Sequence, residues 1–199
     1  MTEGNTPEGI SFEKLAKISP AAVTKVDRDC NYVYANSKAE ELLGLEKSEI
    51  QNRTYNDPNW KITDFEGNEF PEEELPFQQV KNTRDPVFDV KFAIERPDGK
   101  HRLLSINASP LFDDDGKFDG MVSVIEDITG QVETREELKQ SRERYHKYFE
   151  ELGDAVFILA MVGEVHGKIL EVNSTAVKQT GYSRDELVGM NMIKDLSFP

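Results

Sequence analysis

The chain has 199 residues, and its 38 acidic side chains against 24 basic ones give a formal net charge of −14. A phosphate backbone would repel such a surface, and the single cysteine, Cys30, excludes an internal disulfide and a cysteine-based metal cluster. No apolar run approaches the length that crosses a bilayer, and residues 1–5 lack the basic and hydrophobic regions of a secretory signal, so the sequence predicts a cytoplasmic protein without a nucleic-acid partner or a membrane segment.

The start of the chain predicts a tail, a helix and a hairpin. Residues 1–11 are rich in Gly, Pro, Thr and Glu, a composition typical of a disordered tail. Apolar residues then recur at helical spacing and predict a short helix at 12–18. Two strand-like segments, 21–27 and 31–35, flank a run of turn residues and predict a β-hairpin.

Two helices are expected after this hairpin. Ser37 and Glu40 have the spacing of a capping box, and Gly44 stands where a helix ends, so these residues delimit the first. A shorter helix is expected at 47–50.

The middle of the chain is irregular before it becomes helical again. Residues 51–70 show no regular period, and Trp60 and Phe65 are the expected core anchors there. Pro71 suits the first position of a middle helix, which we expect to run to Asn82.

Three strands in meander order complete the first unit. They are predicted at 87–95, 101–111 and 118–127, with turns rich in Asp, Gly and Pro between them. This order predicts an α+β domain over residues 12–130, with one five-stranded antiparallel sheet and helices on one face. A small apolar space between helices and sheet is where a ligand could bind, and the candidates for lining it are Trp60, Phe77, Leu104, Ile106 and Val124.

A charged run without proline follows the last strand and predicts a connecting helix at 131–147. Its sparse apolar residues include Leu138 and Tyr145, which with Phe149 fall on the spacing of a heptad seam. Two interpretations stay open: a solvated linker helix, or a coiled coil that holds a homodimer together. In both, the helix joins the end of one unit to the start of the next.

The most decisive feature of the sequence is an internal repeat. Asn36-Ser37-Lys38-Ala39 reappears as Asn173-Ser174-Thr175-Ala176, and a glycine stands eight residues after each asparagine. A second copy of the unit is therefore expected at 148–199. This copy lacks the later helix and the three-stranded meander, without which its sheet edge is unpaired, so we expect the chain to be a piece of a longer protein.

Several short motifs occur along the chain in a fixed order, and they are Asn36-Ser37-Lys38-Ala39 before Gly44, Glu74-Leu75-Pro76, Pro97-Asp98-Gly99-Lys100, Ala108-Ser109-Pro110-Leu111 and Asp127-Ile128-Thr129. Together with the repeat, they resemble two consecutive PAS sensor domains, one complete and one cut after its first half. The resemblance implies a sensory and dimerisation module upstream of a histidine kinase, a cyclic-dinucleotide enzyme or a transcription regulator, with a histidine kinase of a two-component system as the favoured output. Within it, Asp127 and Thr129 resemble the family's signal-output junction.

The resemblance also bears on cofactors, and it disfavours haem and covalent flavin. Haem-binding members take their axial histidine mostly from the middle helix, and residues 72–82 contain none. Flavin adduct chemistry needs a cysteine within a helix motif, whereas Cys30 falls in the hairpin turn. The histidines His101, His146 and His166 lack metal-ligand spacing, so no metal site is predicted.

No phosphate-binding glycine loop, nucleophile elbow or HExxH pattern occurs, so this segment is not expected to be an enzyme. Two functions remain. In the first, a small molecule in the interior biases the outgoing helix; in the second, the unit is a ligand-free structural dimerisation and signal-relay module. Strand alternation looks the same in both cases, so the identity and the existence of a ligand stay open. Either module passes its signal through the C-terminal helix to an output domain in the same chain.

Overall fold

The computed structural model describes residues 11–161 and 166–195, and its contacts divide the chain into two compact units, Met1–Val132 and Glu133–Pro199. Each unit is described by itself. Of the predicted tail, residues 1–10 lie outside the described residues. Ser11 caps the first helix, where its hydroxyl accepts a hydrogen bond from the Lys14 backbone N–H.

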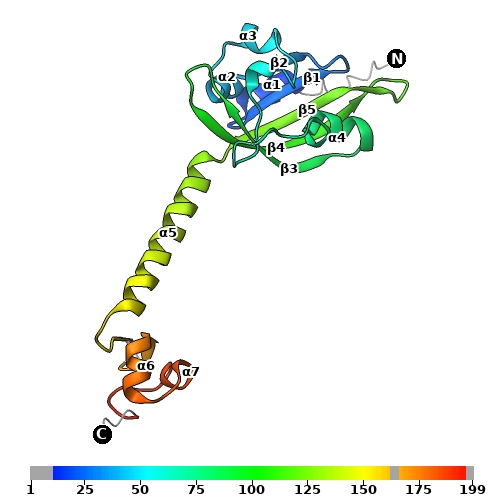
Figure 1. The fold of residues 1–199 in the computed structure, drawn as a ribbon. Helices are drawn as coiled ribbons and strands as arrows, with labels where there is room; N and C mark the ends of the chain where they lie inside the picture. Colours follow the sequence, from blue (N-terminus) through cyan, green and yellow to red (C-terminus); the bar gives the residue numbers. More distant parts are fainter. Residues whose placement is uncertain (1–10, 162–165, 196–199) are drawn as a thin grey trace, which may run out of the picture. The chain divides into compact units, whose positions relative to one another are not determined.

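The first unit confirms the predicted fold class. Its five strands form one antiparallel sheet in the order β2-β1-β5-β4-β3 (Figure 1). They are β1 (Ala22–Asp27), β2 (Tyr32–Ala35), β3 (Val87–Glu95), β4 (His101–Phe112) and β5 (Phe118–Asp127). The helical elements are α1 (Phe12–Ile18), α2 (Ser37–Leu43), α3 (Lys47–Gln51), the 3-10 turns η1 (Pro58–Trp60) and η2 (Glu72–Glu74), and α4 (Pro76–Thr83). Helices α2 and α3 contact β1 and β2, while α4 contacts β3, β4 and β5.

The predicted middle helix is wrong at its start. Residues from Glu72 to Glu74 form the 3-10 turn, Leu75 is extended with φ −67° and ψ 144°, and α4 begins only at Pro76. The reason is steric, because the ring of a proline disfavours helical geometry in the residue before it. Pro76, rather than Pro71, therefore occupies the first helical position.

The sheet buries one face against the helices, and alternation decides which side chains lie there. On β5 the buried side chains are Met121, Ser123 and Ile125. Val124 points to the opposite face and is 41% exposed, so its predicted place in the interior is wrong. Ile125, one residue along, takes that place. The inward Ser123 is satisfied by a 2.7 Å hydrogen bond with Thr24 on β1.

Phe65 is also not the core anchor that the sequence predicted, since it is 39% exposed. It sits at the tip of a tight loop that the Asp64 carboxylate closes by accepting hydrogen bonds from the backbone N–H groups of Glu66 and Asn68.

Asn36 holds the first helix–strand corner together. Its side-chain oxygen accepts hydrogen bonds from the backbone N–H groups of Val23 and Ala39, both at 3.0 Å. Its amide group donates to the carbonyls of Ala16 and Ala21. One buried side chain thus caps α2 and fixes the start of β1, which explains why an asparagine is needed there.

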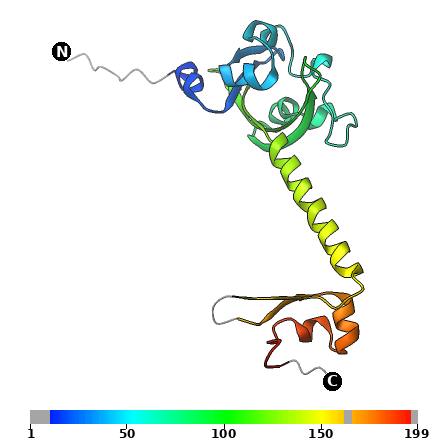
Figure 2. The same ribbon diagram turned by 90° about the vertical axis from the view of Figure 1, so that its left-hand side faces the viewer.

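The second unit repeats this corner (Figure 2). Its strands β6 (Phe157–Leu159) and β7 (Ile169–Val172) pair antiparallel and lead into α6 (Ser174–Thr180) and α7 (Arg184–Leu187). Asn173 caps α6 and accepts a hydrogen bond from the Val156 N–H at 3.0 Å, as Asn36 does from Val23. The buried cluster among its described residues is small and consists of Ile169, Val172, Ala176 and Leu187.

Candidate functional site

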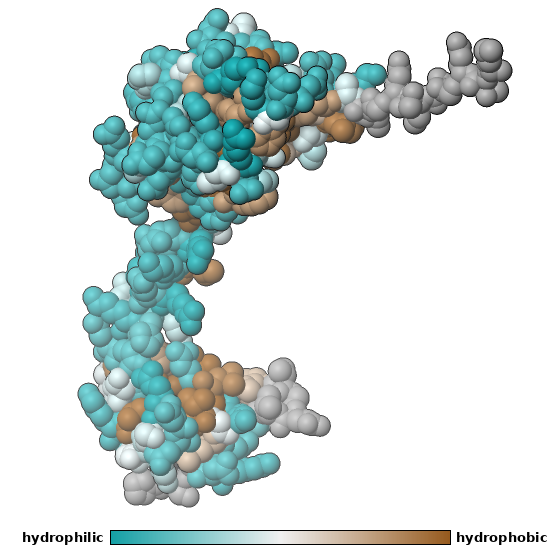
Figure 3. Space-filling view, turned by 90° about the vertical axis from the view of Figure 1, so that its right-hand side faces the viewer, coloured by the Kyte–Doolittle hydropathy of each residue, from teal (hydrophilic) through white to brown (hydrophobic). Residues whose placement is uncertain are grey.

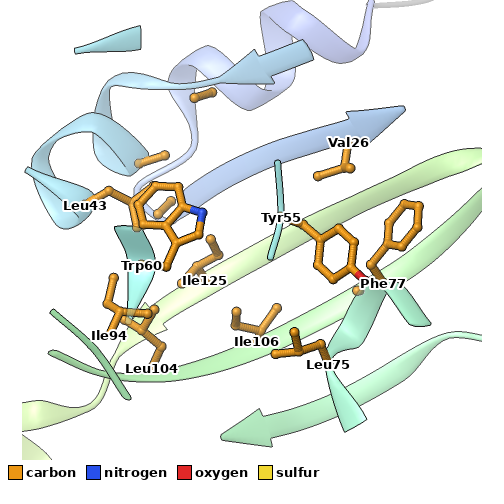
Figure 4. Packing of buried hydrophobic residues seen from close by; sticks show 14 of the residues in the cluster. Val26, Leu43, Tyr55, Trp60, Leu75, Phe77, Ile94, Leu104, Ile106 and Ile125 are labelled. Carbon is orange, nitrogen blue, oxygen red and sulfur yellow. The ribbon is translucent and has the colours of Figure 1, made fainter. Parts of the chain in front are cut away.

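The predicted ligand space lies between the helices and the sheet of the first unit, and side chains fill most of it (Figure 4). Trp60, Leu104 and Ile106 line a cavity of about 30 Å³ there, and its other walls are Tyr32, Leu43, Tyr55, Ile62, Phe92, Ile94 and Ile125. Such a space holds one or two waters, whereas pockets for small ligands span about 300–1,000 Å³. Among the residues that the structure describes, the space enclosed between the helices and the sheet is therefore too small for an organic ligand.

Trp60 is fixed by three neighbours. Its indole N–H donates to the Thr54 carbonyl at 2.9 Å, and its ring lies edge-on to Tyr32 with centroids 6.0 Å apart. The Arg53 guanidinium lies over the ring at 4.6 Å. With 3% of its surface exposed, Trp60 is a structural anchor of the core.

Phe77 is fully buried but does not line the cavity; it stacks on Tyr55 with ring centroids 4.6 Å apart (Figure 4). The Tyr55 hydroxyl donates to Glu72 at 3.0 Å and accepts from Gln78 at 2.9 Å. Burial, followed by the hydrogen bond to Glu72, raises the pKa of Tyr55. Tyr55 was missed from the sequence because it lies in an irregular stretch without periodicity.

The junction between β5 and α5 (Thr129–Glu151) is tied to β4 through both predicted junction residues. The Asp127 carboxylate lies 3.2 Å from the Arg102 guanidinium and accepts the Thr129 N–H at 2.9 Å. The Thr129 hydroxyl accepts the Leu103 N–H at 2.9 Å, and the Ile128 N–H donates to the Leu103 carbonyl at 2.9 Å. The first turn of α5 is therefore bonded to the neighbouring strand at several points.

The three candidate dimer residues of α5 have different surroundings. Leu138 is 69% exposed and Tyr145 46%, so both are available to a partner. Phe149 is only 4% exposed and stacks on Tyr145 with ring centroids 5.6 Å apart, so its predicted place on a dimer seam is wrong. Phe149 belongs to the second unit, and its burial there leaves little surface for a partner. Figure 3 shows mostly hydrophilic residues on one face of the molecule, with apolar residues gathered in limited patches.

Glu150, which the sequence did not single out, binds the end of α5 to the second unit. Its carboxylate accepts hydrogen bonds from both the backbone N–H and the hydroxyl of Ser174, and it pairs with Arg184 at 2.5 Å. The Ser174 hydrogen bond, followed by that from Arg184, lowers the pKa of Glu150 to about 2. The Thr175 hydroxyl adds a 2.8 Å hydrogen bond to the Leu152 carbonyl. One acid among many in a charged helix has no signal in the sequence.

Metal sites and membrane-spanning helices are absent from residues 11–161 and 166–195. There, no group of three or more His, Cys, Asp or Glu side chains is arranged to hold a metal ion. No described helix is long and apolar enough to cross a membrane. Cys30 is half-buried beside the core, and burial raises the pKa of its thiol.

Comparison with known families gives two matches. A model described as the PAS fold matches residues 17–133, and another with the same description matches residues 143–199. A curated protein of Escherichia coli (strain K12), named as probable diguanylate cyclase DgcE, is 25% identical over 140 residues, which is 68% of this chain and 12% of that protein. This chain therefore spans only a small part of that relative's length.

Two solved structures are similar to parts of this chain. An RNA-binding light-oxygen-voltage receptor is 22% identical with a TM-score of 0.52, over 74% of this chain and 42% of that one. The PAS domain of a Colwellia psychrerythraea protein is 15% identical with a TM-score of 0.48, over 59% of this chain and 94% of that one. The likeness to the receptor concerns the fold alone.

Proposed function

Because the chain belongs to the PAS-fold family, whose model matches more than half of it, we propose that it is a sensory and signal-relay segment of a longer signal-transduction protein. In this proposal residues 12–130 form a complete sensor domain and residues 131–147 a connecting helix. Residues 148–199 form the first half of a second sensor domain. The segment carries no catalytic activity of its own.

The hydrogen bonding at the β5–α5 junction is the observation that carries the proposal. Because β5 runs directly into α5, and the side chains of Asp127 and Thr129 bind to β4, a shift of these strands moves the first turn of the helix with it. Ile128 between them is buried, which adds packing to the hydrogen bonds. We infer that signals leave the first unit along α5.

The filled interior favours relay over an internal ligand. A small molecule would have to displace Trp60 or the side chains of Leu104 and Ile106, which are all at most 6% exposed. Large buried side chains contribute about 2–5 kcal/mol each to stability, so opening this space is costly. We therefore favour the ligand-free alternative for the interior itself.

The output domain is proposed from the comparisons and the resemblance. A histidine kinase was the expectation from the sequence alone. The name of the Escherichia coli relative points to another output, a diguanylate cyclase, which is a cyclic-dinucleotide enzyme. We propose the cyclase as the second candidate output, because this segment aligns with a part of that relative.

We further propose that the segment acts as a homodimer in the cytoplasm. The exposed Leu138 and Tyr145 on α5 are consistent with a helical contact between two copies. The net charge of −14 suits a solvated surface.

The test uses the full-length protein that contains this segment. Asp127→Asn removes the charge that pairs with Arg102, and we expect the output to lose its dependence on the stimulus. Asp115→Asn, at an exposed hairpin tip, is the matched control. Cyclic-dinucleotide synthesis and autophosphorylation are both measured, which also separates the two candidate outputs. A stimulus response that is unchanged in Asp127→Asn refutes the proposed relay.

A further inference from the structure

A surface groove of about 580 Å³ opens at the end of β5, between α2 and the turn after β3. It exists because the neighbouring strand is short: β1 begins at Ala22, opposite Ile125, so no β1 residue lies opposite Glu126 or Asp127. The volume falls within the range typical of small-ligand pockets. The space between the helices and the sheet is mostly filled by side chains, whereas this groove is open.

Most charged side chains that line the groove form hydrogen bonds or short ion pairs with described residues of the protein, and that of Arg96 does not. Lys38 binds Glu41 at 2.7 Å, and Arg102 lies 3.2 Å from Asp127. Glu126 accepts a 2.9 Å hydrogen bond from the Gln131 side chain. The charges of Lys38, Glu41, Arg102 and Asp127 are therefore compensated within the protein, and the Glu126 carboxylate has a neutral partner.

The Arg96 side chain has a long contact with one carboxylate but no hydrogen bond to any described residue. Across the described part of the chain its guanidinium has no hydrogen-bond partner, and its buried Nε is left without an acceptor. The nearest carboxylate oxygen belongs to Asp98, 3.8 Å from Nε, which is too long for a hydrogen bond. A buried donor without a partner is rare in folded proteins and costs stability.

Gly44 holds this guanidinium in place. A Cβ built at position 44 would lie 2.5 Å from the Arg96 Nε, so only glycine allows the side chain to lie against the end of α2. Gly44 has φ +69°, which glycine also adopts without strain. Arg96 is thereby packed against the end of α2, with its Nε buried there and its terminal amino groups without hydrogen-bond partners among the residues that the structure describes.

The floor beside Arg96 is apolar and includes Ala22, Leu42 and Val124. A planar carboxylate matches the forked donors of a guanidinium, and an apolar body would cover the floor. We propose that this groove binds a small amphipathic carboxylate, with its carboxylate on Arg96 and its apolar part over Leu42 and Val124. The ligand would lie against Asp127, and only this link to signalling rests on the proposed function.

The binding test uses hexanoate as the probe and the whole chain. Nitrogen-15 spectra resolve arginine Nε–Hε signals, so the Arg96 group is observed directly and assigned by its loss in Arg96→Gln. We expect hexanoate, against sodium chloride of equal ionic strength, to shift this signal and the Asp127 amide saturably. Arg96→Gln should weaken binding about tenfold or more, as expected for loss of a charge-assisted hydrogen bond.

Two controls make the outcome decisive. Arg28→Gln changes an arginine that already pairs with Asp119 at 2.5 Å, and it should leave hexanoate binding unchanged. Arg96→Lys keeps the positive charge near the end of α2, so an intact amide spectrum with weakened binding separates recognition from folding. A linear, unsaturable shift, equal binding in Arg96→Gln, or an equal response to inorganic phosphate overturns the proposal. This experiment measures only hexanoate binding. A negative result therefore says nothing about the relay through α5, which the Asp127→Asn variant tests.

Discussion

Replacing Glu150 by glutamine should destabilise the second unit while the first unit stays intact. The variant keeps the size of the side chain but removes the charge that Ser174 and Arg184 share. A pKa lowered from 4.5 to about 2 corresponds to about 3 kcal/mol, since one unit of pKa is worth about 1.4 kcal/mol. The Glu150 side chain is 19% exposed, so screening by solvent reduces the expected loss to about 2 kcal/mol.

The pH dependence follows from the direction of this shift. Because the folded-state pKa of Glu150 is depressed, its stabilisation is complete above pH 4.5 and is lost as the pH falls towards about 2. The difference in the free energy of unfolding between wild type and Glu150→Gln should therefore shrink across that interval.

The assay is urea unfolding of the whole chain, followed through methyl signals of Ile169 and Val172 for the second unit and Ile106 for the first. Glu151→Gln changes the exposed neighbouring acid and is the matched control. If Glu150→Gln and Glu151→Gln unfold the second unit at the same urea concentration at pH 7, the carboxylate does not hold α5 to α6, and the reasoning is refuted.

Further predictions concern folding, cofactors and assembly. Residues 12–130 should fold alone and residues 146–199 should not, and strong amide-exchange protection of β7 in the shorter fragment would contradict this. The purified protein should show no haem or covalent flavin; a Soret band or a reversibly bleaching flavin spectrum would disprove it. Leu138→Glu should weaken a dimer in sedimentation equilibrium without changing the circular dichroism, whereas an unchanged dimer places the interface elsewhere. Gly44→Ala should cost about 1 kcal/mol or more in thermal unfolding, because the new methyl strains the backbone and meets Arg96; an unchanged midpoint would show that this corner adapts freely.

Much of the first unit could be predicted because local chemistry and tertiary packing agree there. Turn residues delimit the strands. Asn36 and Asn173 each predict the same helix–strand corner, in which the asparagine caps the helix. β5 was harder, since Val122 and Val124 are apolar on the outer face while the inward Ser123 is polar. The hydrophobic pattern of this strand therefore does not indicate which face is buried. For this reason Val124 was predicted in the interior in place of Ile125, the next residue.

The features that decide function depend on partners far apart in the sequence. Arg96 meets Gly44, and Glu150 meets Ser174 and Arg184, through contacts that no periodicity encodes. The apolar residues of α5 have the spacing of a seam, but spacing does not say which of them are buried within one chain, and Phe149 is one that is. Contacts between residues so far apart in the sequence can be identified only from the three-dimensional structure.

The central claim is that β4 and α5 are mechanically joined, and amide hydrogen exchange in Thr129→Val tests it most directly. The variant removes the oxygen that accepts the Leu103 N–H, and a lost hydrogen bond of about 1–3 kcal/mol should speed exchange there and in the first turn of α5 by roughly tenfold. Thr134→Val, exposed on the same helix, is the control. Faster exchange confined to Thr129→Val, with β1 unchanged, is the predicted result; first-turn amides as protected as in wild type would contradict the account.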